Sequence, residues 1–383
     1  MEYDDRLGAA DALASRMKHV PWSILVIFGC SGGHGAATDA TVSMDATPDA
    51  YVPIIDPSKI AASCFQGGTA PELQLDSGFQ GADWNDPHVV KANGEYWMYA
   101  SSNLGFSPAP PSPVQIYRLT STDAASWTLD PTTPVLTVTA GTWDQGGDET
   151  PAVVSFGGMY HMFWTGYPDT WPDVNPANYR IGHATSSDGI TWTKDASYVL
   201  APSGTQGDFD QYVVAEPGPV VFDDKLFLYF TTMGVDATLQ TTLQTIGVMT
   251  SSDGTTWSAP ALAFGPDQTV YPRASNWVGY STPNAAVIAG QVHVFVDVAN
   301  DHGNNTWTQE ALHHVYSADG FTSWTQDSAP LRRNTDFSWT QREIRSVDAL
   351  LDGTTLRLYF AGDDLGDTGV WGIGQMTCSL SSS

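Results

Sequence analysis

Hydrophobic residues in this chain gather in short runs that return at a nearly constant interval. Four prolines stand 64, 66 and 66 residues apart and each opens a strand-like apolar run: Pro87, Pro151, Pro217 and Pro283. Val347 continues this series 64 residues later. After a turn, each run is followed by an aromatic one, such as Tyr96–Tyr99 or Leu226–Phe230. Short apolar runs separated by turn residues predict β-strands rather than helices.

A second pattern follows the aromatic runs. Four Ser-x-Asp turns lead to tryptophans that are 65, 65 and 67 residues apart: Trp127, Trp192, Trp257 and Trp324. Asp and Gly favour tight turns, and a large aromatic ring can pack between layers. We therefore interpret these turns as structural. They superficially resemble the Asp-boxes of sialidases, which have one more residue between Asp and Gly.

The two patterns define five units of about 65 residues, each with room for four strands. Five such units predict an all-β fold, a five-bladed β-propeller with four-stranded blades. The last unit has no residues left for a fourth strand before Ser383. An open sheet edge invites pairing, so we expect an N-terminal strand around Pro71–Leu75 to close the ring.

Composition supports a folded chain with many turns. Of 383 residues, 42% are hydrophobic, 36 are Gly and 24 are Pro. The net charge of −27 repels phosphate backbones and anionic lipid, which argues against nucleic-acid binding. The sequence contains no nucleotide-binding or zinc-protease motif, so no cofactor is expected.

The N-terminal region carries a targeting pattern. The apolar run Val20–Gly29 is too short to span a bilayer and leads to Cys30. This order resembles a bacterial lipoprotein signal, with Cys30 as the lipidated residue and Met17 as an alternative true start. We therefore expect a signal peptide at 1–29, a flexible tether at 30–60 and the propeller at 61–383. The resemblance implies an extracytoplasmic, lipid-anchored protein that contacts the membrane only through this anchor.

Two further cysteines lie near the two ends of the predicted ring. Cys64 precedes the candidate closing strand and Cys378 lies in the last strand. Thiols outside the cytoplasm tend to oxidise. With Cys30 lipidated, we expect a Cys64–Cys378 disulfide that staples the ends together.

Candidate chemistry lies just before the repeated proline. In a propeller the starts of the innermost strands converge at one mouth, and this column contains two acids, which are costly to bury without a purpose. The column reads Asp86, Thr150, Glu216, Thr282 and Ser346. The second unit adds Glu149 and Asp148 immediately upstream. Strand alternation places Asp148 on the face of Thr150, and either acid could line the site.

The segments Trp84–Pro87 and Ala215–Pro217, set on this repeat, resemble glycoside hydrolase families 32, 43, 62 and 68 over roughly residues 80 to 380. The resemblance implies cleavage of arabinosyl, xylosyl or fructosyl bonds, with Asp86 as nucleophile or base and Glu216 as general acid. Such cleavage needs one carboxyl to protonate the leaving oxygen and another to attack or to activate water. Thr150 departs from the family pattern, which has an acid in the second unit.

Several residues near the mouth are candidates for binding sugar, with ordinary packing as the alternative for the aromatic ones: Trp84, Asn85, His88, Trp143, Tyr212 and Arg345. We expect a carbohydrate substrate and a monomer. No metal ligand set is apparent, and an axial cation in the propeller channel stays open. A non-catalytic glycan-binding lipoprotein and a sialidase-like hydrolase remain alternatives.

Overall fold

The computed structural model describes residues 54–73, 84–102, 113–170, 174–236, 238–239, 241–303, 307–363 and 371–382. The predicted signal peptide, Cys30 and the tether up to residue 53 lie outside these residues. Within them the regular structure consists of β-strands and four single 3₁₀ turns: η1 (Pro57–Lys59), η2 (Pro176–Asn178), η3 (Arg273–Ser275) and η4 (Asn334–Asp336). The prediction of an all-β fold is confirmed. No helix in the described part has the length and apolar character needed to cross a membrane.

The strands follow the sequence repeat, and each repeat forms an antiparallel meander whose fourth strand is short. Repeat 1 contains β2 (Trp84–Ala92), β3 (Glu95–Ser102), β4 (Gln115–Ser121) and β5 (Thr128–Leu129). Repeat 2 contains β6 (Gly147–Phe156), β7 (Met159–Tyr167), β8 (Arg180–Ser186) and β9 (Thr193–Lys194). Repeat 3 contains β10 (Val213–Phe222), β11 (Lys225–Asp236), β12 (Thr241–Ser251) and β13 (Ala261–Phe264).

The two remaining repeats complete the strand set. Repeat 4 contains β14 (Trp277–Ile288), β15 (Gln291–Asp301), β16 (Trp307–Ser317), β17 (Trp324–Gln326) and β18 (Arg332–Arg333). Repeat 5 contains β19 (Glu343–Asp352), β20 (Thr355–Asp363) and β21 (Gly372–Ser379), with β1 (Gln66–Gly67) paired to β21. One parallel bridge, Gln244 to Gly279, joins the sheets of repeats 3 and 4 into one.

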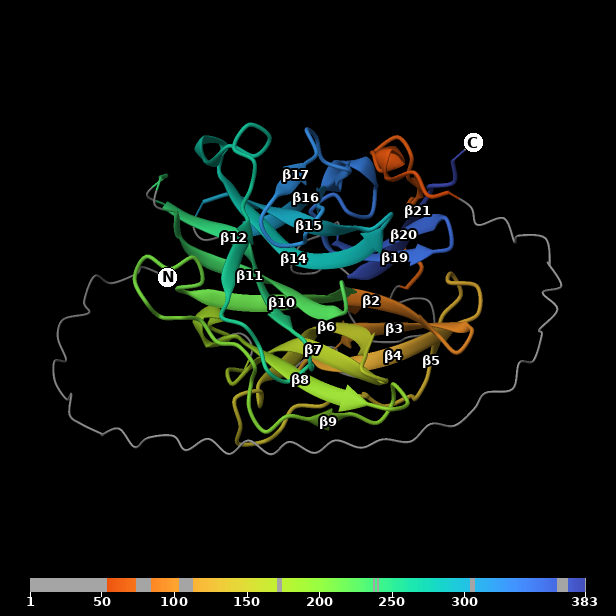
Figure 1. The fold of residues 1–383 in the computed structure, drawn as a ribbon, viewed down its shortest axis with the longest axis vertical. Helices are drawn as coiled ribbons and strands as arrows, with labels where there is room; N and C mark the ends of the chain where they lie inside the picture. The colour runs from red at the N-terminus through yellow and green to blue at the C-terminus, as the bar shows by residue number, and fades with distance from the viewer. Residues whose placement is uncertain are drawn as a thin grey trace, which may run out of the picture. The chain divides into compact units, whose positions relative to one another are not determined.

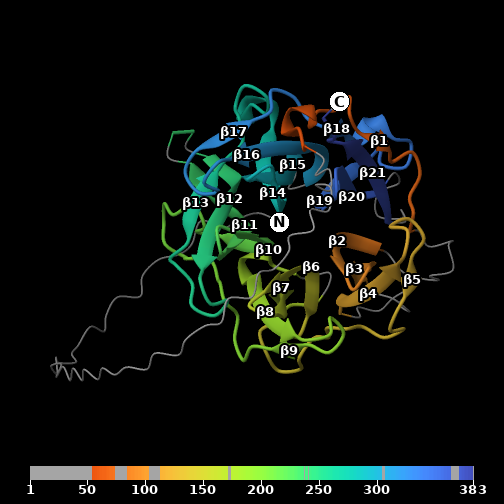
Figure 2. The same cartoon turned by 45° about the vertical axis from the view of Figure 1, so that its right-hand side comes forward.

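The first strands of the repeats lie innermost and contact one another in sequence. β2 packs against β6, β6 against β10, β10 against β14, β14 against β19, and β19 against β2. The five sheets are visible in Figure 1, and the turned view of Figure 2 shows their innermost strands around the middle of the domain. This arrangement brings residues that are about 65 positions apart in the sequence to one place.

Aromatic residues and the Ser-x-Asp turns join neighbouring repeats. The tyrosine hydroxyl on the second strand of one repeat donates to a backbone oxygen in the turn of the next repeat. Three such bonds, at 2.8, 2.6 and 3.2 Å, join Tyr99 to Gly189, Tyr229 to Gly320 and Tyr359 to Ala124. The turn tryptophans pack edge-on against the same aromatic position, as Trp192 does on Tyr99. The turns therefore have the structural role that their composition indicates.

The two ends of the domain meet at repeat 5. Besides the pairing of β1 with β21, Leu73 forms a bridge to Ile373. The paired strand thus begins earlier than the segment Pro71–Leu75 that the sequence indicated, and residues 74–80 lie outside the described part. Cys64 and Cys378 form the expected disulfide, with Cα atoms 5.2 Å apart, so this prediction is confirmed.

The tether is shorter than composition indicated. Ile55 pairs with Ser381, and Ile60 is buried in the hydrophobic cluster beneath repeat 5. Residues 54–60 therefore belong to the folded unit, although they were assigned to the tether. Their isoleucines can bury apolar surface, which the Gly, Ala, Thr and Asp residues before them cannot do.

Candidate active site

Each innermost strand contains a β-bulge at the column residue. The pairing register shifts at this point in all five repeats, for example between Asn85 and His88. All five column residues have a left-handed backbone, with φ of 53°, 51°, 55°, 46° and 53° for Asp86, Thr150, Glu216, Thr282 and Ser346. A bulge of this kind bends the strand and re-aims a side chain, and such bulges are common beside active sites. The five column residues are thus held in one unusual conformation.

The five bulges meet around a small pocket on the axis of the domain. All five repeats contribute to its lining: Asp86, Pro87, His88, Thr150, Pro151, Ala152, Pro217, Thr282, Pro283, Asn284, Ser346 and Val347. The repeated prolines and the residues beside them therefore converge, as expected for the mouth of the predicted ring.

Three carboxyl groups from repeats 1, 2 and 3 face this mouth. Asp86, which is 6% exposed, accepts a hydrogen bond of 2.7 Å from the Ser346 hydroxyl. Glu216 accepts bonds of 2.6 Å from the Thr231 hydroxyl and 3.0 Å from the backbone N–H of Thr282. Glu149 accepts a longer bond of 3.4 Å from the hydroxyl of Tyr167.

The three carboxyls lie close enough to change one another's ionisation. Burial, reinforced by the charge of Asp86, raises the pKa of Glu149 to about 8, and Glu216 contributes in the same direction. Burial, followed by the charge of Asp297, raises the pKa of Glu216 to about 7, with Asp86 adding to the rise. Glu216 can thus hold a proton near neutral pH, and a general acid requires this property.

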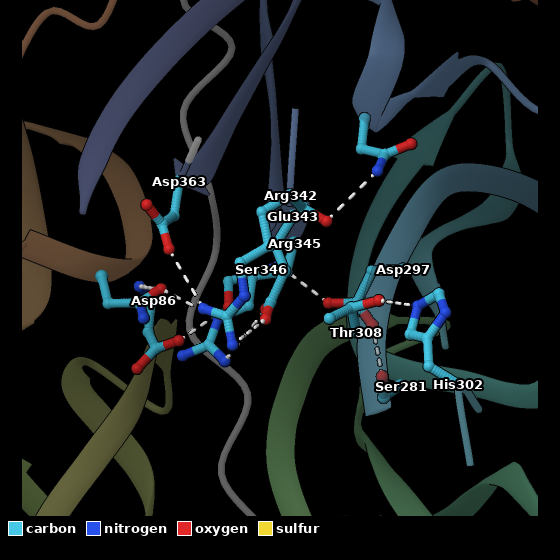
Figure 3. Close-up of polar contacts among 12 residues, drawn as sticks. Asp86, Ser281, Asp297, His302, Thr308, Arg342, Glu343, Arg345, Ser346 and Asp363 are labelled. Carbon is cyan, nitrogen blue, oxygen red and sulfur yellow. Dashed lines mark hydrogen bonds and ion pairs between the residues drawn. The ribbon is translucent and has the colours of Figure 1, made fainter. Parts of the chain in front are cut away.

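Arg345 provides positive charge at the same place. Its Nε donates to the side-chain oxygen of Asn85 at 3.3 Å, and its guanidinium lies 4.4 Å from the ring centroid of Trp371. Burial opposes its charge, but the carboxylates of Asp86 and Glu343 outweigh burial and raise the pKa of Arg345. Figure 3 shows Arg345 close to Asp86 and Ser346. Asn85 and Arg345 therefore lie at the mouth, as the sequence indicated.

Asp148 does not join the other acids. Its carboxylate accepts bonds of 2.8 Å from the Trp164 indole and 2.7 Å from Lys194, and it is fully buried. The bulge after Glu149 breaks the alternation that assigned Asp148 to the face of Thr150. Of the two candidates from repeat 2, the structure brings Glu149 to the mouth and places Asp148 inside the sheet as a structural ion pair.

Three of the four aromatic candidates pack elsewhere. Trp84 is 0% exposed and packs edge-on against Tyr117 in the core. Trp143 stacks on Trp164 within repeat 2. These positions correct the expectation that the two tryptophans form sugar-stacking walls, because neither ring is presented to the mouth.

His88 lines the axial pocket but is held inside it. Its Nε2 is 2.7 Å from the backbone oxygen of Val153, and its Nδ1 is 2.8 Å from the Asp348 carboxylate. Both ring nitrogens thus have partners below the mouth, so His88 is not a sugar-stacking wall. Tyr212 differs, since its side chain is 41% exposed immediately before β10.

Two aromatic residues of the site escaped the sequence reasoning. Burial and the charge of Glu149 raise the pKa of Tyr167 and of Tyr179, so both phenols lie near that carboxyl. Their ring centroids are 5.2 Å apart. Tyr167 ends β7 opposite Gly147, and this position at the mouth end of a second strand was the available signal. Tyr179 follows η2 in a connection with no repeated pattern.

The sequence reasoning also missed Asp297. This acid on β15 is fully buried and accepts a hydrogen bond of 2.8 Å from the N–H of Ser346. A signal existed, because Ser101, Thr165, Thr231 and Asp297 are spaced 64, 66 and 66 residues apart. Among the described residues, no group of three or more His, Cys, Asp or Glu side chains has an arrangement suited to a metal ion.

No protein-family model matches the chain. Two uncharacterized proteins of Mycobacterium tuberculosis, MT1551 and Rv1502, are each 31% identical over 143 residues. This match covers 36% of the chain and 42% of each relative, so the chain spans less than half the length of these curated relatives.

Solved structures resemble the chain over most of its length. A family 117 glycoside hydrolase of the marine bacterium Zobellia galactanivorans matches 83% of this chain and 90% of its own, with a TM-score of 0.57 and 15% identity. A thermostable family-43 glycoside hydrolase matches 79% and 90%, at 0.56 and 14%. The catalytic domain of the Coprinopsis cinerea GH62 α-L-arabinofuranosidase matches 83% and 98%, at 0.57 and 14%. The chain therefore shares the fold of these glycoside hydrolases.

Proposed function

We propose that this chain is a five-bladed β-propeller glycoside hydrolase that cleaves its substrate with Asp86 and Glu216. One observation carries the proposal. Carboxyl groups from three successive repeats meet at one mouth, and the pKa of Glu216 is raised to about 7 by burial and by Asp297. The shared fold raises the prior for glycosidase chemistry, while these carboxyls supply the groups that the reaction needs.

The five blades of this proposal follow from the strand contacts. Each repeat supplies one antiparallel sheet, and the innermost strands contact one another in a cycle from β2 through β19 and back to β2. The pairing of β1 with β21 and the Cys64–Cys378 disulfide supply the closure at repeat 5.

The two carboxyls have different roles in the proposed reaction. Protonated Glu216 donates its proton to the glycosidic oxygen as the bond from that oxygen to the anomeric carbon breaks. Asp86 either attacks the anomeric carbon or takes a proton from the water that does so, and its bond from Ser346 fixes its orientation. Glu149, which interacts with both charges, keeps the mouth acidic.

The surroundings of the carboxyls favour a neutral sugar. The chain has a net charge of −27, which disfavours acidic polysaccharides. Tyr167 and Tyr179 lie beside Glu149, and aromatic rings pack against the apolar faces of sugars. We propose a substrate with arabinosyl, xylosyl or fructosyl groups, and the arabinofuranosidase among the similar structures favours the first.

One observation favours a non-catalytic alternative. Thr150 occupies the column position in repeat 2, where the family resemblance implies an acid. If Glu149 does not replace that acid, the mouth is a glycan-binding site without turnover.

A substrate panel separates these two functions. The panel contains aryl glycosides of arabinofuranose and xylose, with arabinan, xylan and fructan oligosaccharides, and Glu216→Gln is the matched control. Turnover by the wild type that the control lacks supports the hydrolase. Calorimetric binding without turnover supports the glycan-binding alternative, and absence of both binding and turnover across the panel overturns both.

We also propose that the protein is extracytoplasmic and anchored through lipid on Cys30, as the pattern Val20–Gly29 followed by Cys30 indicates. The variant Cys30→Ser should lose lipid labelling and leave the membrane fraction of a bacterial host. Unchanged membrane association of this variant would contradict the anchor.

A further inference from the structure

Neighbouring repeats are joined at the mouth by a recurring hydrogen bond. A side chain on the second strand of one repeat accepts a bond from the backbone N–H of the column residue in the next repeat. Four such bonds, of 2.8, 2.7, 2.9 and 2.8 Å, join Ser101 to Thr150, Thr165 to Glu216, Thr231 to Thr282 and Asp297 to Ser346. At the fifth junction the equivalent residue is Ala361, and the N–H of Asp86 bonds to Asn85 instead.

Repeat 4 departs from this pattern in a costly way. A hydroxyl makes the bond at three junctions, so the junction does not require a carboxylate. Asp297 is nevertheless fully buried, and burying an acid is expensive unless it is well compensated. The departure therefore indicates a task for the charge of Asp297 beyond joining the blades.

The contacts of Asp297 link it to both proposed catalytic carboxyls. It accepts from the Ser281 hydroxyl and from the N–H of Ser346, while the Ser346 hydroxyl donates to Asp86. On the other side, Thr282, which follows Ser281, donates its N–H to Glu216. Figure 3 shows Ser346 between Asp86 and Asp297, with Ser281 on the far side of Asp297.

We propose that Asp297 is a positioning residue of this site: its buried negative charge holds the proton on Glu216, and its bond to Ser346 fixes the hydroxyl that orients Asp86. This role rests on the proposed function, in which Glu216 is the general acid. Asp297 does not touch the substrate and acts through these two carboxyls.

Electrostatics of the surrounding groups support this division of charge. Asp297 is the first charge after burial that raises the pKa of Glu216. Burial also raises the pKa of Asp297, but hydrogen bonds and Arg345 oppose that rise and favour its ionised form. The titratable groups that act on this pair come from every neighbouring element: Asp86 on β2, Glu149 on β6, Tyr179 after η2 and Arg345 on β19. Two buried carboxyls in this relation share a proton rather than ionise together.

The test measures the ionisation of Glu216 directly, without substrate. Carbon-13 labelled glutamate side chains are titrated by NMR, and the Glu216 carboxyl signal is assigned by its loss in Glu216→Gln. The variants Asp297→Asn and Asp297→Thr remove the charge and keep an acceptor for the N–H of Ser346. Thr is the residue that repeats 2 and 3 use at this position. Ser101→Ala is the matched control, because it removes the equivalent junction bond in repeat 1.

We expect the Glu216 midpoint to fall by about one pH unit or more in both Asp297 variants, the usual effect of removing a nearby like charge. It should stay within roughly 0.3 unit of the wild type in Ser101→Ala. An unchanged midpoint in the folded Asp297 variants overturns the positioning role. If neither variant folds, the wild type decides, since Glu216 and Asp297 should each titrate in two steps, and two independent single-step titrations overturn the role.

Activity then separates this role from the proposed function. If the midpoint moves but no glycan is hydrolysed, the pairing of Asp297 with Glu216 stands and the hydrolase is wrong. If the wild type hydrolyses glycans and the midpoint does not move, the hydrolase stands and the positioning role is wrong. If both hold, the basic limb of the pH–rate profile should shift to lower pH in Asp297→Thr, with the same displacement as the NMR midpoint.

Discussion

The carboxylates of the Ser-x-Asp turns and those of the mouth are opposites. Asp188 accepts bonds of 2.8 Å from the N–H groups of both Ile190 and Thr191, and one of 2.9 Å from Ser186. Backbone hydrogen bonds lower the pKa of this exposed carboxyl and of its three counterparts, Asp123, Asp253 and Asp319, together with side-chain bonds. At the mouth, burial raises the pKa of Glu149 and Glu216 instead.

This difference shows where to look for chemistry in a repeat protein. The turn aspartates recur with the same partners in four repeats, so their bonds stabilise each repeat in the same way. The mouth acids occur at positions where other repeats have Thr or Ser, such as Thr150 and Thr282 in the column of Glu216. A residue that departs from the repeat and is costly to bury is the better candidate for function.

The sharpest test of this contrast removes charge at each place. Asp86→Asn and Glu216→Gln should each lower the hydrolysis rate of oligosaccharides by ~10²–10⁴-fold. Aryl glycosides with acidic leaving groups need little protonation, so Glu216→Gln should retain more activity on them than Asp86→Asn does. Steady-state rates on both substrate types check this prediction. The turn variant Asp188→Asn is the matched control, and equal losses in all three variants would contradict the contrast.

The mouth acids should also cost stability at high pH. The pKa of Glu149 is raised to about 8, mainly by burial, from an ordinary value near 4.5. The folded state therefore holds a proton that the unfolded chain releases, and stability falls as pH rises from about 4.5 to 8. Glu149→Gln should raise Tm by on the order of 5 °C at pH 9 and by little at pH 4. Scanning calorimetry across this range checks the sign, and a Tm that falls at pH 9 would refute it.

The turn acids should show the reverse behaviour with a smaller effect. Since backbone hydrogen bonds lower the pKa of Asp188, its contribution to stability is present above about pH 4 and is lost as pH falls further. Asp188→Ala should lower Tm by roughly 1–3 °C at pH 7, typical of a lost backbone-capping side chain. Thermal melts at pH 7 and pH 3 measure the difference, which should narrow at pH 3. A difference that grows on acidification would contradict this account.

Much of the fold could be read from the sequence because its information is local and repeated. Strand and turn composition, together with the intervals between Pro87, Pro151 and Pro217, indicated the order of strands and the place where their ends converge. The Cys64–Cys378 disulfide followed from the same register. Residues at equivalent positions of a repeat occupy equivalent positions in space, so a column in the sequence becomes a ring in the structure.

The choice among neighbouring residues required the tertiary structure. A bulge at the column turned Glu149 to the mouth and left Asp148 paired with Lys194, although strict alternation predicted otherwise. Trp84 and Trp143 pack inside the sheets. Whether an aromatic side chain lines a site or fills a core depends on which distant segments cover it, and no local pattern reports that.

The electrostatics of the site were also decided by the tertiary structure. The sequence alone determined that Asp86 and Glu216 open strands that converge, since both precede the repeated proline. It did not determine that Asp297, 81 residues after Glu216, would lie buried within a few atoms of the same proton. The ionisation of a carboxyl depends on its burial and on the charges around it in space, and only the folded chain brings those charges together.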